Sequence, residues 1–444
     1  MSRKPLIYCG ACLIAGLVIG YFYAQANAGS AIKEQPGAVR GMATTHPAFS
    51  NAAGSSGTNA ALQRALEFWI STNTTAEFLT KGAGGTGGTL DRPLDGSSQT
   101  NFDHIMADMP SFSTIHILAG TYQTLGELDW GPKTGQRIIG SGIGITVLQF
   151  PASAVASGEV NRLRIINPSP PYFQTNIEVS DMTLDCNYQP GSMITLNGID
   201  LHGSGNAIRR VKVINAASFT SGITNYTEAW GITMESFPYG EASENIIEGC
   251  EVSQFTNNNG NNLSAICLLE NNSGIIRDNR VIGNPPNLVF ALAPGSHNSL
   301  VEGNYVVGAY SASHTDDGTG NTNIIFAHNR FVNCGSAIDW SNGHVENVTF
   351  AFNDIILTNS PYFPRNNGSS TAFNFQPSPA TFKNVAIIGN TVSFTGLTNV
   401  PKLEFIDAHN ITGLIVEKNT VDARLTNSFA NCLNIRMDNN HDLP

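Results

Sequence analysis

The chain has 444 residues, which is enough for two or three ordinary domains, although a regular repeat would let it grow as one elongated domain. Its formal net charge is −11, and no basic run follows the first four residues, so nucleic-acid binding is excluded as the main function. The 44 glycines and the many asparagines of the second half indicate numerous tight turns and few surface helices.

Residues 1–28 are typical of an export signal. Arg3 and Lys4 precede an apolar stretch from Leu6 to Tyr23, and small residues up to Ala28 supply a cleavage site. We expect cleavage after Ala28 and a secreted, periplasmic or cell-surface protein with no other membrane contact. The alternative is that the apolar stretch, of about 18 residues, stays as an N-terminal anchor.

The cysteines do not indicate a disulfide framework. Five remain after the signal, and an odd number cannot all pair within one chain. They are also too scattered for a Cys-x-x-Cys metal site, so we expect small buried core residues. The five are Cys186, Cys250, Cys267, Cys334 and Cys432.

The segment after the signal contains no recognisable catalytic or binding motif. Residues 29–58 are predicted to be a flexible leader. Residues 59–135 are predicted to form an N-terminal cap and the first coils of a repeat. A helix starting at Asn59, with Leu62 and Trp69 on one face, would close one end.

A short template repeats within residues 136–444: an apolar residue, two variable residues, an anchor, one variable residue and an apolar residue. Its apolar and polar positions alternate, so each copy is a strand, and copies recurring within a few tens of residues stack as parallel coils. Asparagine suits the anchor because it tolerates a left-handed turn and its amides stack in a ladder. The anchors are Met182, Val211, Cys250, Asn279, Asn304, Asn329, Asn353, Asn390 and Asn419.

A second strand precedes each anchor, and its polar residues alternate with inward apolar ones, so they share one outer face. Neighbouring coils lie about 4.8 Å apart, a separation that suits acid and base carboxylates of glycoside cleavage. These outward residues are Asp200, His202, Glu235, Asp339, Asp407 and His409.

The densest group of catalytic-type residues is Asp316 and Asp317, one coil before Asp339. Crowded carboxylates raise one pKa and leave an acid beside a base, as glycoside cleavage requires. We therefore predict these three as catalytic, with His314 and His344 as donors to a sugar. The alternative is a plain Asp-Asp-Gly turn and a solvated strand residue.

Two long intervals between anchors carry aromatic loops, which on a rigid solenoid are places for binding clefts. Tyr226, Trp230 and Glu235 are expected to contact substrate in one of them. The alternative is that these loops only pack on themselves. An acidic protein acting on an acidic glycan also needs local basic groups, for which Arg330, Lys383 and Arg365 are the candidates.

The strand-then-Gly-x-Tyr segment 116–122 and the coil repeat resemble the pectate-lyase-like and polygalacturonase-like superfamily. The resemblance implies an all-β, right-handed, single-stranded parallel β-helix, here with a short N-terminal capping helix, and a polysaccharide partner. Asp316 and Asp317, followed by Asn329, resemble the paired-aspartate coil of polygalacturonases, which implies inverting hydrolysis. The Asn-Thr-Asp, Gly-His-Gly and Arg-x-Lys motifs of that family are missing.

Lyases of the superfamily hold calcium with acidic residues and use Arg or Lys as a base, which implies a Ca²⁺ site at the same aspartates. Together, these observations predict a monomer that cleaves an acidic, pectin-like glycan by hydrolysis or β-elimination. The alternative from another class is a non-catalytic, adhesin-like or glycan-binding β-helix, which the missing motifs favour.

Overall fold

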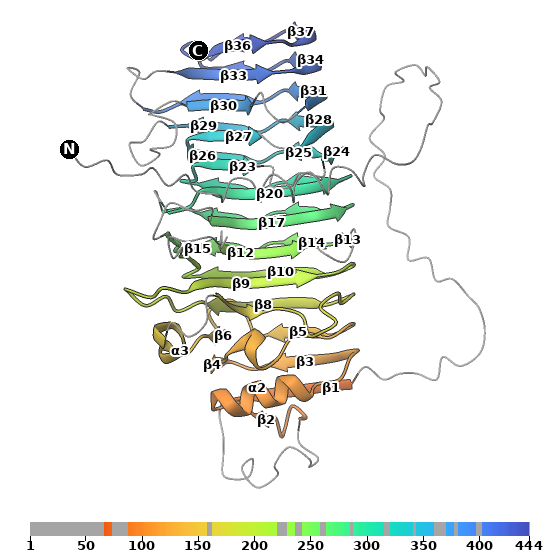
Figure 1. Cartoon of the computed structure of the whole chain (residues 1–444), viewed down its shortest axis with the longest axis vertical. Helices are drawn as coiled ribbons and strands as arrows, with labels where there is room; N and C mark the ends of the chain where they lie inside the picture. Colours follow the sequence, from red (N-terminus) through yellow and green to blue (C-terminus); the bar gives the residue numbers. More distant parts are fainter. Residues whose placement is uncertain are drawn as a thin grey trace, which may run out of the picture. The chain divides into compact units, whose positions relative to one another are not determined.

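Strands of successive coils pair side by side in parallel register and stack into a solenoid (Figure 1). The computed structural model describes residues 66–72, 88–157, 162–219, 229–235, 242–257, 263–284, 287–314, 320–340, 343–358, 370–376, 381–396 and 402–443. Among them, no helix is long and apolar enough to cross a membrane.

The stacked strands form three sheets, of which the first carries the candidate site. It consists of β7 (Arg162–Ile166), β9 (Thr195–His202), β12 (Ala229–Glu235), β17 (Leu263–Asn272), β20 (Phe290–His297), β23 (Ser311–His314), β27 (Ser336–Trp340), β30 (Ser370–Phe375), β33 (Leu403–His409) and β36 (Thr426–Ala430).

The second sheet contains β1 (Leu66–Ser71), β3 (Ser113–Ile117), β5 (Arg137–Gly140), β8 (Glu178–Asp185), β10 (Ala207–Ile214), β14 (Ile246–Glu248), β18 (Ile275–Arg277), β21 (Leu300–Glu302), β25 (Ile325–Ala327), β28 (His344–Ala351), β31 (Thr381–Ile388), β34 (Ile411–Glu417) and β37 (Leu433–Asp438).

The third sheet contains β4 (Gly120–Gln123), β6 (Thr146–Gln149), the second halves of β8 and β10, β15 (Glu251–Ser253), β19 (Arg280–Ile282), β22 (Tyr305–Val307), β26 (Arg330–Cys334), β29 (Asp354–Leu357), β32 (Thr391–Phe394), β35 (Thr420–Val421) and β38 (His441–Asp442). The remaining elements are short: β2 (Leu94–Asp95), β11 (Ala217–Ser218), β13 (Ala242–Ser243), β16 (Thr256–Asn257), β24 (Asn321–Thr322), α2 (Gln99–Asp108), α3 (Ala152–Ser157) and η1 (Gly126–Leu128).

The predicted inward positions form a continuous core inside the three sheets. Phe350, for example, is fully buried and contacts the rings of Phe326 and Phe373, at centroid distances of 5.2 and 5.4 Å. Burying one such side chain contributes about 1.5–3 kcal/mol. All five cysteines after residue 28 are free, and four of them are buried as predicted, whereas Cys432 is only partly buried.

The anchor asparagines form the predicted ladder. The Oδ1 of Asn353 accepts hydrogen bonds from the backbone N and the Nδ2 of Asn329, both at 3.0 Å, and its own Nδ2 donates to the Phe326 carbonyl at 3.2 Å. The left-handed residue is the one before each anchor, such as His328 at φ 55° and Phe352 at φ 55°. The turn conformation is therefore not the reason for asparagine there, whereas the ladder of hydrogen bonds is.

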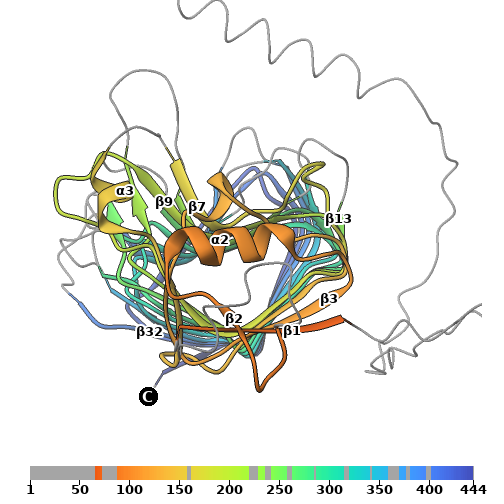
Figure 2. The same cartoon turned by 90° about the horizontal axis from the view of Figure 1, so that it is seen from below.

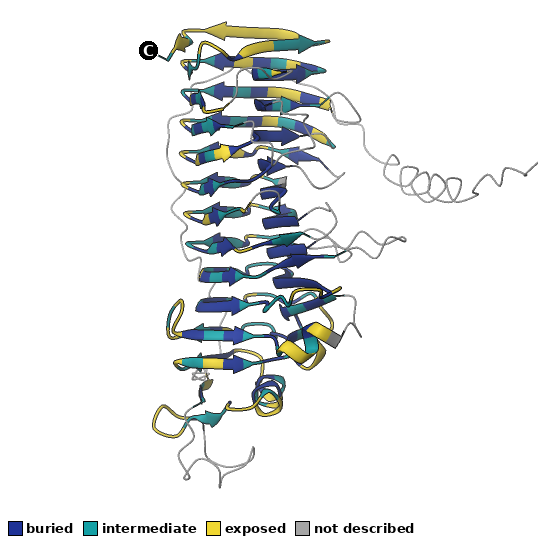
Figure 3. Cartoon of the chain, turned by 90° about the vertical axis from the view of Figure 1, so that its left-hand side faces the viewer, coloured by how far each residue is buried: buried dark blue, intermediate teal, exposed yellow. Residues whose placement is uncertain are grey.

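The helix predicted from Asn59 to Trp69 is wrong for its second half, because Leu66–Ser71 is strand β1. This segment pairs with β3, which supplies its backbone hydrogen bonds, and Trp69 stacks on His116. Residues 59–65 lie outside the described part. Helix α2 instead lies across the N-terminal end of the coils (Figure 2). Its Phe102 is buried and packs against the ring of Tyr122. At the other end, β37 is exposed along its length (Figure 3).

Candidate active site

The outer face of the first sheet carries a row of residues at one strand position. Strand pairing aligns Asp200 with Thr233, then Cys267, then Ala293, and, farther along, His314 with Asp339, Asn374 and Asp407. Cys267 and Ala293 pack with Trp230 in a small cluster separate from the main core, which shows that this row points away from the interior.

This face is nevertheless buried. Asp200 is fully buried, and only 6% of Asp339 and 8% of Asp407 is exposed. The alternative interpretation of Asp339 as a solvated strand residue is therefore wrong. A buried carboxylate costs free energy unless nearby charges or hydrogen bonds compensate it. The partners of each aspartate therefore indicate whether it has a structural or a functional role.

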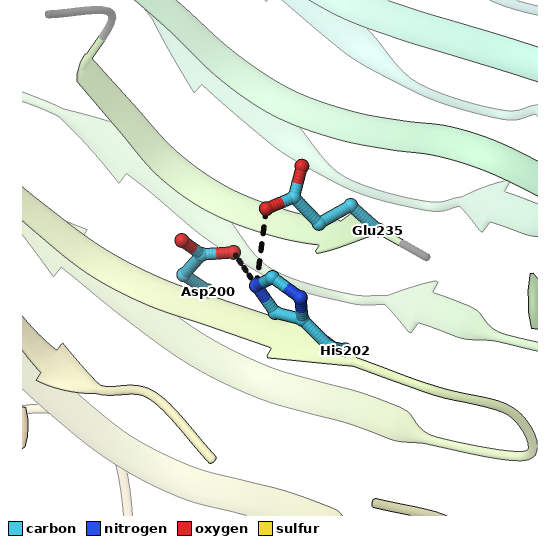
Figure 4. Close-up of side chains that lie close together, drawn as sticks. All are labelled: Asp200, His202 and Glu235. Carbon is cyan, nitrogen blue, oxygen red and sulfur yellow. Dashed lines mark ion pairs between the residues drawn. The ribbon is translucent and has the colours of Figure 1, made fainter. Parts of the chain in front are cut away.

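Asp200, His202 and Glu235 converge on one point (Figure 4). The Nε2 of His202 lies 3.0 Å from Glu235 Oε1 and 3.3 Å from Asp200 Oδ1, so two carboxylates meet one imidazole nitrogen. His202 and Asp200 stand two residues apart on β9, and Glu235 pairs in register with His202 from β12. The side chains of His202 and Glu235 are 14% and 15% exposed, whereas that of Asp200 has no exposed area.

Two arginines from β7 complete this group. Arg164 places its Nε 2.7 Å from Asp200 Oδ2 and its Nη1 2.6 Å from Glu127 Oε2. The guanidinium of Arg162 lies 5.2 Å from the centre of the Trp230 ring. The sequence analysis did not identify Arg162, Arg164 or Glu127. The available signal was the Arg-x-Arg alternation in a strand, which places both side chains on the outer face.

These contacts separate the pKa values of the three central groups. Burial raises the pKa of Glu235, and the hydrogen bond from His202 opposes this only in part. Burial also disfavours the ionised form of Asp200, but the hydrogen bond from His202 and the charge of Arg164 outweigh it and lower that pKa. Burial opposes protonation of His202, yet its bonds to Asp200 and Glu235 raise its pKa to about 9. The pKa of Glu235 is thus shifted up, that of Asp200 down and that of His202 up, within one group of three side chains.

The same three residues are the one group in the described part of the chain whose side chains could hold a metal ion, with ligand atoms within 4.8 Å of one another. Calcium prefers six to eight oxygen ligands. This group offers one imidazole and two carboxylates, one of them ion-paired with Arg164, and a metal would have to displace the proton of His202. The donor set does not fit calcium.

Three buried polar atoms beside the group lack hydrogen-bond partners among the described residues. They are Asn197 Nδ2, Trp230 Nε1 and Thr233 Oγ1. An unsatisfied buried polar atom costs about 1–3 kcal/mol. A bound water or a ligand hydroxyl would recover part of that cost.

Asp339 lies farther along the same row, among amides. Its Oδ1 accepts hydrogen bonds from Asn374 Nδ2 at 2.9 Å and Gln376 Nε2 at 2.7 Å. His314 lies beside it, with Nδ1 3.1 Å from the Asp339 carbonyl oxygen and its ring stacked on Phe290. The structure thus brings Asp339 and His314 together. Asp316, Asp317, Tyr226 and Arg365 lie outside the described residues.

Three other predicted site residues lie on different sheets. Arg330 pairs with Asp354 in the third sheet at 3.2 Å. Lys383 and His344 both contact Glu346 in the second sheet, at 3.0 and 3.2 Å. The chain turns between sheets before each of them, so the structure does not bring these basic groups to the row that carries Asp339.

No protein-family model and no curated protein matches the chain. Solved structures, by contrast, match the fold of the chain. A mutant tailspike protein of E. coli bacteriophage HK620, in complex with a pentasaccharide, superposes with a TM-score of 0.52 at 13% identity, covering 80% of this chain and 67% of that one.

A family 28 exopolygalacturonase of Yersinia enterocolitica superposes with a TM-score of 0.48 at 11% sequence identity, covering 84% of this chain and 78% of that one. The A-module of a mannuronan C-5 epimerase of Azotobacter vinelandii superposes with a TM-score of 0.46 at 12% sequence identity, covering 78% of this chain and 94% of that one. The chain has the right-handed parallel β-helix of the pectin lyase-like fold, as predicted.

Proposed function

We propose that the protein is an exported enzyme that cleaves an acidic polysaccharide at the group formed by Asp200, His202 and Glu235. The observation that carries the proposal is the convergence of two carboxylates on His202 Nε2, one partly exposed and the other fully buried. The two carboxylates differ in access and in the direction of their pKa shifts, so Glu235 can reach a substrate while Asp200 holds the histidine.

Glu235 is the group that would touch the substrate. Burial raises its pKa and so favours the protonated form, which is the form that passes a proton to the leaving glycosidic oxygen in hydrolysis and in β-elimination. Asp200 has no exposed area, so it acts as a positioning residue that holds His202 and keeps it protonated. In hydrolysis a water molecule then adds to the anomeric carbon, and the proton that it loses restores Glu235. In β-elimination the C5 proton of a uronate leaves to water, and the imidazolium stabilises the negative charge that develops on the uronate.

The charge of the group favours an acidic substrate. Arg162, Arg164 and His202 supply three cations, and burial raises the pKa of both Glu127 and Glu235, which favours their neutral forms. The excess positive charge would attract a uronate group in a molecule whose net charge is −11. The pentasaccharide bound to the similar tailspike and the export signal predicted at residues 1–28 support a glycan outside the cytoplasm.

The test is a reducing-sugar assay with simultaneous ultraviolet detection of unsaturated products on pectins, alginates and neutral glycans. We expect new reducing ends with an acidic glycan, which Glu235→Gln reduces by about 10²–10⁴-fold, the usual contribution of a general acid. Accompanying ultraviolet absorbance would identify elimination, and its absence hydrolysis.

Asp339→Asn is the matched control, because the sequence analysis placed the reaction at Asp316, Asp317 and Asp339. Loss of activity in Asp339→Asn with full activity in Glu235→Gln would contradict the proposed site and restore that prediction. Glycan binding by the wild-type protein without cleavage of any substrate would contradict an enzyme and favour the adhesin-like alternative.

A further inference from the structure

A second group on the outer face repeats the plan of the candidate site. On β33, His409 Nε2 lies 3.0 Å from Asp407 Oδ1, and Lys402 Nζ lies 3.2 Å from Asp407 Oδ2. The corresponding distances at Asp200 are 3.3 Å to His202 and 2.7 Å to Arg164. In both groups an aspartate lies between a basic side chain and the imidazole of the histidine two residues later in the sequence.

The two groups occupy the same position of their coils. The segments 199–202 and 406–409 read Ile-Asp-Leu-His and Ile-Asp-Ala-His. Seven successive strand pairings connect β9 with β33, which separates the two aspartates by about 34 Å at the usual spacing of strands. Only an extended molecule could contact both.

The third carboxylate is placed differently. Glu235 contacts the imidazole of the first group, whereas Glu404 lies 3.8 Å from the Lys402 ammonium and accepts a hydrogen bond from the Thr371 hydroxyl at 3.4 Å. Burial, and then the charge of Asp407, raises the pKa of Glu404. Among the described residues, the ion pair of His409 is with Asp407, and Glu404 lies against the lysine instead of the imidazole.

The second group is also more open. The side chain of Lys402 is 54% exposed and that of His409 is 26% exposed, against 20% and 14% for Arg164 and His202. Acceptors at Asp407 and Glu404 and donors at Lys402 and His409 match the hydroxyl groups of a sugar. An arrangement that offers donors and acceptors without an acid on the imidazole suits binding rather than cleavage.

We propose that Lys402, Glu404, Asp407 and His409 form a second carbohydrate-binding site, which holds a distant segment of the polysaccharide that reacts at Glu235. The inference rests on the proposed function for the identity of the ligand. It predicts that affinity depends on chain length, because a trisaccharide occupies one site and a polymer occupies both.

Calorimetric titration of the Glu235→Gln protein with polygalacturonate, alginate and a trisaccharide of each tests this. Adding His409→Gln should weaken binding of the polymer about tenfold, as expected for the loss of a charge-assisted hydrogen bond, and leave trisaccharide binding unchanged. Lys402→Met, at a more exposed position, should act in the same direction. His344→Gln, an exposed histidine on the second sheet, is the matched control and should change neither affinity.

Unchanged polymer affinity in both His409→Gln and Lys402→Met, with thermal unfolding like that of the parent, would overturn the second site. Polymer binding that falls in both variants while Glu235→Gln still cleaves would support it and refute only the proposed reacting group. Absence of binding to either polymer by the parent protein would overturn the two proposals together.

Discussion

The asparagine ladder and the outer face of the first sheet both bury polar side chains along the solenoid, yet they treat them in opposite ways. From Asn304 to Asn419 the ladder amides repeat the same bonds: Asn304 Oδ1, for example, accepts from the backbone N and Nδ2 of Asn279, and Asn304 Nδ2 donates to Asn329 Oδ1. On the outer face the contacts are ionic, and buried polar atoms at Asn197 and Thr233 lack partners within the described chain.

The difference indicates that the asparagine ladder has a structural role and the outer face of the first sheet a functional one. Neutral, fully bonded amides cost little to bury and fix the register of the coils. Charged groups with incomplete bonding and shifted pKa values cost stability and are typical of sites where chemistry or binding occurs. Substitutions in the ladder should therefore change stability alone, and substitutions at the outer face should change activity.

The largest expected effect on stability is that of Asn353→Ala. It removes the hydrogen bonds that Asn353 makes with the backbone N of Asn329 and the carbonyl of Phe326 in the interior, and it leaves Asn329 Nδ2 with the Val301 carbonyl alone. At about 1–3 kcal/mol for each unsatisfied group, the free energy of unfolding should fall by roughly 3 kcal/mol or more, measured by denaturant titration. A fall below about 1 kcal/mol would show that the ladder does not hold the coils together.

The next effect is a pH dependence centred on His202. Its pKa is about 9 in the folded protein and near 6.5 in the unfolded chain, so the stabilisation is complete below about pH 6.5 and is lost as the pH rises through about 9. The loss should amount to at most about 3 kcal/mol in unfolding experiments across that range. His202→Gln should remove the slope, while His344→Gln should keep it.

A smaller effect is expected for Glu235→Gln on stability. The partly buried Glu235 has a raised pKa, and glutamine retains its shape and an oxygen that accepts from His202. We expect the free energy of unfolding at pH 7 to change by about 1 kcal/mol or less. Destabilisation as large as that of Asn353→Ala would mean that Glu235 is a structural residue.

The smallest effect is predicted for Asn347→Gly, in a second, exposed row of asparagines. Asn347 donates to Asn323 Oδ1 at 3.1 Å and accepts from Asn384 Nδ2 at 2.9 Å, and its φ is 56°. Glycine keeps that left-handed conformation, and the lost bonds face water, so denaturant titration should show a change of about 0.5 kcal/mol. A loss near that of Asn353→Ala would refute the distinction between the two rows.

The coils, the ladder and the shared face of Asp200, Asp339 and Asp407 could be predicted from the sequence. This was possible because the period of two determines to which side of a strand each residue points. It was not sufficient to show that this face is buried, since periodicity says nothing about what covers a sheet. It also failed where the chain turns from one sheet to another, which is why His344 and Lys383 were grouped with Asp339.

The charged partners of Asp200 were missed for a related reason. Arg164 and Glu127 precede it by more than thirty residues, and only the stacking of β7 on β9 and the position of η1 bring them together. The helix expected at Leu66–Trp69 failed because pairing with β3 outweighs local helix preference. Contacts between distant segments determined each of these outcomes.

The most direct test of the difference between the two regions is turnover of the cleaved acidic glycan per folded molecule, measured side by side for Glu235→Gln and Asn353→Ala. We predict that Glu235→Gln loses at least about a hundredfold in turnover while remaining as stable as the wild type, and that Asn353→Ala keeps its turnover below its unfolding temperature. Full turnover in Glu235→Gln, or loss of turnover in folded Asn353→Ala, would contradict the assignment of chemistry to the outer face.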